Sequence, residues 1–220
     1  MIAYLLAELT DWRQRRMRKT LCCSAALMAA LSFVGPLQPL LLALASALVF
    51  IVSAWSDSLD PQDDPYRRAD PEIFRAKSLE IAAGKALSAL VLWLGIGFAL
   101  SPVLAASAAA WGLRGEAILS CLLCWLSSYL LASSICFLSR LSLGGAGSLL
   151  GLGAYLLWLL SSFFSAPLEP ANPFVQTWRI LRLEGVSSIR LCMLEELAAA
   201  AACFACSALV IGIKRRKRDA

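Results

Sequence analysis

The residues best suited to chemistry in this sequence are cysteines and one pair of adjacent carboxylates, and all of them lie in apolar surroundings. Two CxxC pairs are present, Cys121 with Cys124 and Cys203 with Cys206. Four thiolates at this spacing can hold a zinc ion. Both pairs fall in apolar helical stretches, where thiolate formation is disfavoured and cysteine behaves as a small hydrophobic residue. We therefore expect no metal ion and no cofactor.

The paired carboxylates are Glu195 and Glu196, which lie in the last apolar stretch. Such residues are costly at the centre of a bilayer and often mark transport paths. From Glu195 to Ile213 there are 18 helical steps, or about 27 Å of helix, so the pair is expected near the outer boundary of the membrane. Two interpretations stay open: acids of the membrane interface, or acids of a translocation path that bind a proton or a substrate.

Other catalytic patterns were sought in the sequence and are missing from it. The chain has no histidine, so a Ser-His site cannot form, and no GxSxG motif is present. No GxxxxGK[ST] phosphate-binding loop is present either. We therefore expect no enzymatic activity in this chain, and any use of ATP must come from a partner subunit. Nucleic-acid binding is also not expected, because membrane topology accounts for the net charge of +5.

The composition places the chain in a membrane. Of 220 residues, 60% are hydrophobic and 16% are charged, and the mean hydropathy is +0.72. A span needs roughly 20 apolar residues, so we predict an all-α, polytopic membrane helical bundle in one domain with about six spans. The expected apolar segments are 20–34 and 37–55, which form a short hairpin, then 82–105, 117–138, 141–166 and 191–213.

The two ends of the chain constrain its topology. Residues 1–19 are expected to form an amphipathic helix on the membrane surface, and residues 214–220 form a basic tail. Because both basic ends favour the cytoplasm, the number of spans should be even: six if the hairpin crosses, four if it is re-entrant. With six spans, sixteen of the twenty lysines and arginines lie inside. We expect both termini in the cytoplasm and the protein in a plasma membrane, the inner membrane of a bacterium.

The longest polar interval, residues 57–80, separates the hairpin from the later spans. Asp70 is a suitable N-cap and Pro71 fits the first helical position, so a short cytosolic helix is predicted over 71–81. This loop is either a docking surface for a partner or a solvated connector. The candidate partner-coupling residues are Arg67, Arg68, Ile73, Phe74, Arg75 and Lys77.

Two further segments have recognisable patterns. Gly147 and Gly151 form a GxxxG pair extended by Gly144, and such small residues allow helices to approach closely. The contact is either within the chain or between two copies. Residues 167–190 place Phe174 and Trp178 on one helical face, which predicts an amphipathic segment at the outer interface.

This layout resembles the type-2 ABC exporter permease family over nearly the whole chain. The resemblance is carried by Gly84 and Lys85, which open the third span, and by PLEPANPFVQTWRILRLEG before the last span. That second segment is similar to the family's outer Asn-Pro segment followed by a short helix containing Arg and Leu. In place of the family's Glu- and Gly-rich approach to the coupling helix, this chain has SDSLDPQDDP.

The resemblance implies a permease subunit of an ATP-driven exporter. It implies a second permease copy or homologous permease, a separate ATPase subunit that docks on the loop 57–81, and a cargo path between the permeases within the lipid bilayer. An alternative is a membrane scaffold that anchors a soluble partner through the same loop without transport. A membrane-embedded enzyme is the weakest interpretation, because no pair of catalytic groups converges in the sequence.

Overall fold

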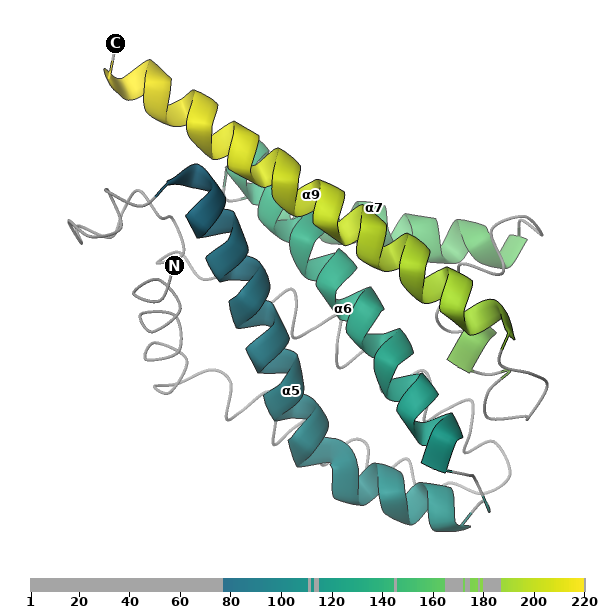
Figure 1. Ribbon diagram of the computed structural model, residues 1–220. Coiled ribbons are helices and arrows are strands. Elements are labelled where there is room, and N and C mark those ends of the chain that lie inside the picture. Colours follow the sequence, from purple (N-terminus) through teal and green to yellow (C-terminus); the bar gives the residue numbers. More distant parts are fainter. Residues whose placement is uncertain are drawn as a thin grey trace.

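The computed structural model describes a helical bundle between residues 77 and 219 (Figure 1). No strand occurs in the described part, which confirms the all-helical class for these residues. The described helices are α5 (Ser78–Ala110), α6 (Gly115–Leu143), α7 (Gly147–Phe164) and α9 (Ser187–Asp219). The described residues are 77–110, 112, 115–144, 146–164, 172, 175–177, 179 and 187–219.

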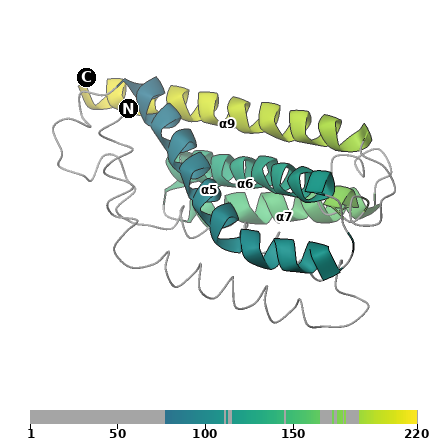
Figure 2. The ribbon, with the colours of Figure 1, turned by 60° about the horizontal axis from the view of Figure 1, so that its bottom comes forward.

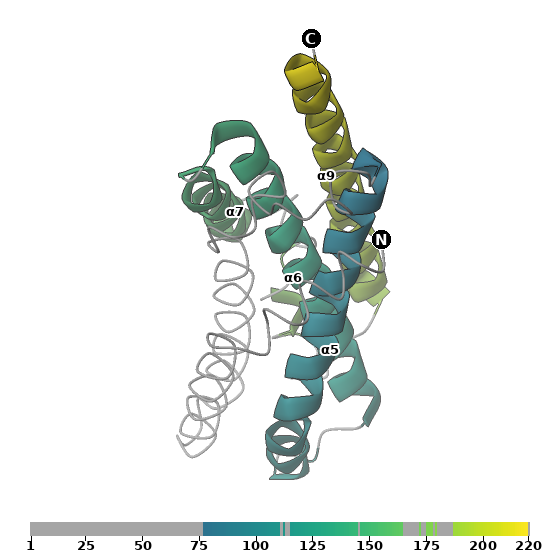
Figure 3. The ribbon, with the colours of Figure 1, turned by 90° about the vertical axis from the view of Figure 1, so that its left-hand side faces the viewer.

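Helix α6 is the centre of the described bundle. It packs against α9, α7 and α5, and α5 also packs against α9. Figure 2 shows α6 between α9 and α7, and Figure 3 shows the same order from another side, with α5 next to α9. Of the apolar part of α6, 61% is buried inside the protein, compared with 28% for α9. Helix α6 is therefore the packing core, whereas α9 leaves most of its surface for the membrane.

Three of these helices are long and apolar enough to cross a membrane. Their candidate spans are Ser78–Gly95, Gly115–Leu143 and Leu191–Lys214. The apolar part of α7, Gly147–Ser161, is shorter, about 22 Å at 1.5 Å per residue. The described chain is thus a membrane-type helical protein, and the six spans with their expected bounds stay a prediction. The expected hairpin at 20–55 and the surface helix at 1–19 lie outside the described residues.

Helix α5 begins earlier than the hydrophobicity of the sequence indicates. Its first residue is Ser78, and the backbone N–H of Lys77 donates a 3.0 Å hydrogen bond to Oε2 of Glu80. A glutamate at this position satisfies a backbone donor that the helix start would otherwise leave unpaired. Residues 78–81 therefore belong to the spanning helix and not to a separate short helix over 71–81. Gly84 and Lys85, expected to open the span, lie within the second turn of α5.

The connection between α6 and α7 is a tight turn built on Gly144. This glycine has a φ of +79°, and its N–H donates to the carbonyl of Arg140 at 2.9 Å. Glycine is favoured in this left-handed conformation at the end of a helix. Gly144 therefore terminates α6, and no described atom lies within 4 Å of the Cβ that it lacks. Gly144 was expected to act in helix packing and the fourth span to end at Leu138, whereas Gly144 forms this turn and α6 continues to Leu143.

The other two glycines of the pattern lie against α6 in the same chain. A Cβ at Gly147 would clash with the carbonyl oxygen of Ser139, and one at Gly151 would lie 2.7 Å from the Ser139 hydroxyl oxygen. Since real Cβ atoms do not approach this closely, both glycines are needed for the contact between α6 and α7. Of the two alternatives left open by the sequence, the structure has the contact within the chain.

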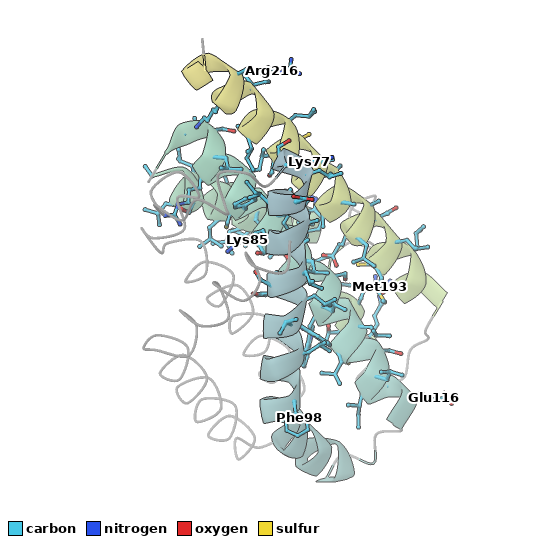
Figure 4. The ribbon with its side chains drawn as sticks, turned by 60° about the vertical axis from the view of Figure 1, so that its left-hand side comes forward. Lys77, Lys85, Phe98, Glu116, Met193 and Arg216 are labelled. Atoms are coloured by element: carbon cyan, nitrogen blue, oxygen red, sulfur yellow. The ribbon has the colours of Figure 1, made fainter. Side chains whose placement is uncertain are left out.

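The start of α5 and the ends of α6 and α9 meet at one end of the bundle. An apolar cluster joins them there, and the Lys214 ammonium donates to the carbonyl of Leu141. Figure 4 shows Lys77 and Arg216 at this end and Glu116 at the opposite end. The cluster consists of Ile81, Phe137, Leu141 and Ile211, with Phe204 and Val210 packed against it.

Candidate functional site

The two adjacent glutamates of α9 have opposite surroundings. Glu195 is exposed, whereas Glu196 is only 2% exposed and faces α6. Successive residues of an α-helix are separated by about 100°, so neighbours can differ in this way. Both lie within the candidate span Leu191–Lys214. The structure therefore separates the pair into an outward-facing acid and a buried one.

The Glu196 carboxyl group is hydrogen-bonded to two serines of α6. The Ser127 hydroxyl oxygen is 2.5 Å from Oε2, and the Ser128 hydroxyl oxygen is 3.0 Å from Oε1 and 3.1 Å from Oε2. Buried polar groups without hydrogen bonds are expensive inside an apolar medium. The two serines satisfy this requirement for Glu196 and join α6 to α9 at the same time.

Both serines also lie close to a backbone carbonyl of their own helix. The hydroxyl oxygens of Ser127 and Ser128 are 2.8 Å and 3.1 Å from the carbonyl oxygen of Cys124. Bonds to the carbonyl three or four residues earlier are common for serine in apolar helices. Each serine therefore has two competing acceptors, the backbone carbonyl and the glutamate.

Three helices contribute side chains to this buried site. Tyr155 of α7 is buried, lies beside Ser128 and interacts electrostatically with Glu196. On α9, Cys192 lies one turn before Glu196, and its thiol is hydrogen-bonded to the Cys124 thiol of α6. We call this group, made of Cys124, Ser127, Ser128, Tyr155, Cys192 and Glu196, the Glu196 cluster.

A second set of buried polar contacts ties the outer segment 167–190 to the bundle. Trp125 Nε1 of α6 donates to Thr177 Oγ1 at 3.1 Å, and Asn172 Nδ2 donates to the carbonyl of Leu159 at 3.2 Å. Asn172, Gln176 and Thr177 are all buried. The described residues of this segment thus pack into the bundle, whereas the expected apolar face with Phe174 and Trp178 lies outside the described residues.

The candidate partner-coupling residues are mostly beyond the described part of the chain. Lys77 is exposed next to the start of α5. The others lie outside the described residues, and they are Arg67, Arg68, Ile73, Phe74 and Arg75.

The cysteines of the two CxxC pairs differ in exposure. Cys121 and Cys124 are buried in α6, whereas Cys203 is half-buried and Cys206 is exposed on α9. Among the described residues no group of three metal-binding side chains is arranged to hold an ion.

The sequence indicated Glu196 but not its partners. The only signal for them is that Ser127-Ser128 is an adjacent serine pair in a largely apolar helix, but Ser133-Ser134 is a second such pair, and serines are also common in helix packing without any site. Comparison of the chain with models of protein families, with curated proteins and with solved structures finds no match.

Proposed function

We propose that this chain is the membrane-spanning permease subunit of an ATP-driven exporter, with ATP hydrolysis in a separate subunit. The observation that carries the proposal is the burial of Glu196 between α6 and α9, inside a candidate span. An ionisable group buried between two spans is costly, and it is characteristic of helices that form or border a transport path, here near the end of the span that begins at Leu191. A protein that only anchors a partner has no need of such a group.

The distribution of charge supports a cytoplasmic location for the end of the bundle that carries Lys77 and Arg216. The basic tail of α9 continues the helix as far as Asp219 at this end. Lysines and arginines next to spans favour the cytoplasmic side. Both termini are then cytoplasmic, and the protein belongs to a plasma membrane, the inner membrane in a bacterium.

The continuity of α5 supports a mechanical role for the loop 57–81. Because α5 begins at Ser78, any force on residues just before it acts directly on a helix of 33 residues that packs against α6 and α9. An ATPase subunit docked on this loop would move α5 against α6 and α9. The apolar anchors would be Ile73 and Phe74, and the orienting charges would be Arg67, Arg68, Arg75 and Lys77.

Cargo would cross between this chain and a second permease copy or a homologous permease. Helix α9 suits a border of that path or of the lipid bilayer, since its exposed residues include Leu191, Leu194 and Leu209. No residue of the described part indicates the chemical class of the cargo.

Association with an ATPase subunit tests the proposal. The full-length tagged chain is purified from its natural membranes in a mild detergent, and co-purifying ATPase is quantified by mass spectrometry. Phe74→Ala should reduce association at least tenfold, because truncation of an interface anchor typically costs roughly 2 kcal/mol or more. Arg67→Ala should cause a smaller, salt-dependent loss.

A control variant is available at the opposite end of the bundle. Leu119 is an exposed leucine near the start of α6, so Leu119→Ala should leave association unchanged. If Phe74→Ala keeps the full amount of ATPase, the coupling role of the loop is wrong. If no ATPase accompanies the wild-type chain, the scaffold interpretation replaces the exporter.

A further inference from the structure

The hydrogen bonds of the Glu196 cluster differ with the protonation of the carboxyl group. Ser127 and Ser128 each have one hydroxyl proton to donate. Their possible acceptors are the carbonyl oxygen of Cys124, at 2.8 Å and 3.1 Å, and the Glu196 oxygens, at 2.5 to 3.1 Å. These are five close oxygen–oxygen contacts for two serine protons, so neither serine can donate to the Cys124 carbonyl and to an ionised Glu196 at the same time. The Tyr155 hydroxyl is also hydrogen-bonded to Ser128.

A proton on Glu196 adds a donor to this network and allows Ser128 to donate to the backbone. The carboxyl O–H then donates to Ser128, Ser128 donates to the carbonyl of Cys124, and Ser127 donates to the other carboxyl oxygen. When the carboxyl is ionised, both serines must donate to it, and neither donates to the carbonyl. Rotation of the Ser128 hydroxyl converts one arrangement into the other without displacement of any non-hydrogen atom.

No cation compensates a charge at this position in the described part of the chain. The titratable groups around Glu196 are Cys124 from α6, Tyr155 from α7 and Cys192 from α9, and no such group of α5 interacts with it. A buried carboxylate without a cationic partner is unfavourable. A bound proton neutralises the Glu196 carboxyl and removes this cost while α6 and α9 are in contact.

The spacing of the oxygens suits a proton better than a metal ion. Contacts of 2.5 to 3.1 Å match direct O–H···O hydrogen bonds. A calcium ion needs six or more oxygen ligands at about 2.3–2.6 Å, and these oxygens would have to move apart to admit it. We propose that Glu196, Ser127 and Ser128 form a proton-binding site that holds one proton while α6 and α9 are in contact.

The use of this site rests on the proposed transport function. During a transport cycle, separation of α6 from α9 would expose the carboxyl to water, which would take the proton as hydronium and leave the carboxylate. When α6 and α9 came back into contact, the Glu196 carboxylate would bind one proton again. The site would thereby link the protonation of Glu196 to the conformation of the bundle.

Infrared spectroscopy of the full-length protein in lipid nanodiscs tests the proposal. A protonated carboxyl has a C=O stretching band that a carboxylate lacks. At neutral pH the wild-type protein should show one such band from inside the bundle, and Glu196→Gln should abolish it. Glutamine keeps one donor and one acceptor at this position, so the fold should be retained. Glu195→Gln is the matched control, because Glu195 is exposed, and it should leave the band unchanged.

Two further arms make the test decisive. Ser128→Ala removes the acceptor of the carboxyl proton and should shift the band to a higher frequency, as expected for a weaker hydrogen bond. Replacement of potassium chloride by sodium chloride, at constant pH and ionic strength, should not change the band. A spectrum that is identical in wild type and Glu196→Gln, or a band that sodium removes, would overturn the proton site.

The result is independent of the ATPase experiment. A missing band together with an associated ATPase contradicts the proton site and leaves the exporter intact. A band at Glu196 in a chain that never associates with an ATPase contradicts the exporter and leaves the proton site as a chemical property of the bundle.

Discussion

The hydroxyl oxygen of Ser127 lies 2.5 Å from Oε2 of Glu196, and this contact connects the centre of α6 to α9 across 69 residues of sequence. The pair is buried, because both side chains are less than 3% exposed. Hydrogen bonds of this kind act as polar links between helices in a membrane. The contact therefore fixes the rotation of α9 about its axis, with Glu196 inward and Glu195 outward.

Loss of this hydrogen bond should destabilise the bundle. Ser127→Ala is expected to lower the free energy of unfolding by about 0.5–2 kcal/mol, since it removes one buried partner of Glu196. Ser120→Ala is the control, because Ser120 lies on the same helix and its hydroxyl bonds the carbonyl of Glu116 in an exposed position. Thermal unfolding in detergent measures the difference. Equal melting temperatures for the two variants would contradict the role of Ser127.

The contact between α6 and α7 depends on Gly151. Gly151→Leu should push α7 away from Ser139 and cost about 1–3 kcal/mol through overpacking, with no change in oligomeric state because the contact is within the chain. Gly153→Leu is the matched control, since no described atom lies within 4 Å of its Cβ position. Melting temperature and size-exclusion chromatography report both effects. A change of oligomeric state with unchanged melting would instead indicate a seam between copies.

The thiol contact between Cys124 and Cys192 allows a direct test of helix packing. In a protein that keeps only these two cysteines, mild oxidation should form a disulfide between α6 and α9. Mass spectrometry of the digested protein detects the cross-linked peptides. A protein that keeps Cys121 and Cys206 instead should give none, because Cys206 is exposed on the outer surface of α9. Cross-linking of the second pair alone would contradict the packing of these helices.

Membrane orientation can be checked at exposed positions at the two ends of the bundle. Lys77→Cys and Arg216→Cys should react with a membrane-impermeant maleimide only from the cytoplasm, and Glu116→Cys only from outside. The native cysteines are replaced beforehand. Reaction of all three positions from one side would contradict the crossing of the membrane by α5 and α6.

The sequence predicted a membrane-type helical protein but not the rotation of each described helix about its axis. Hydrophobic segments are visible because a span must be apolar along its whole length. The sequence does not distinguish the inward from the outward face of a helix, because lipid is as apolar as the core of the bundle. The alanine-rich surroundings of Glu195 and Glu196 therefore gave no sign of which acid is buried.

Local hydrogen bonding explains two differences from the expected boundaries. Residues 71–81 were expected to form a separate helix because Asp70 and Pro71 fit a helix start, whereas the Glu80 side chain caps a continuous α5 at Lys77. Gly144 was grouped with Gly147 and Gly151 by spacing alone, yet its positive φ ends α6. Spacing indicated the packing of the latter two correctly, since small residues four apart lie on one helical face.

The most direct test of the exporter proposal is ATP hydrolysis by the complex purified through the tagged full-length chain. We predict that hydrolysis co-elutes with the wild-type chain, is retained in the control Leu119→Ala, and is lost with the partner in Phe74→Ala. A mock purification from cells without the tagged chain sets the background. If the wild-type chain is purified intact from its natural membranes and the co-eluting hydrolysis does not exceed this background, the chain is not the permease of an ATP-driven exporter.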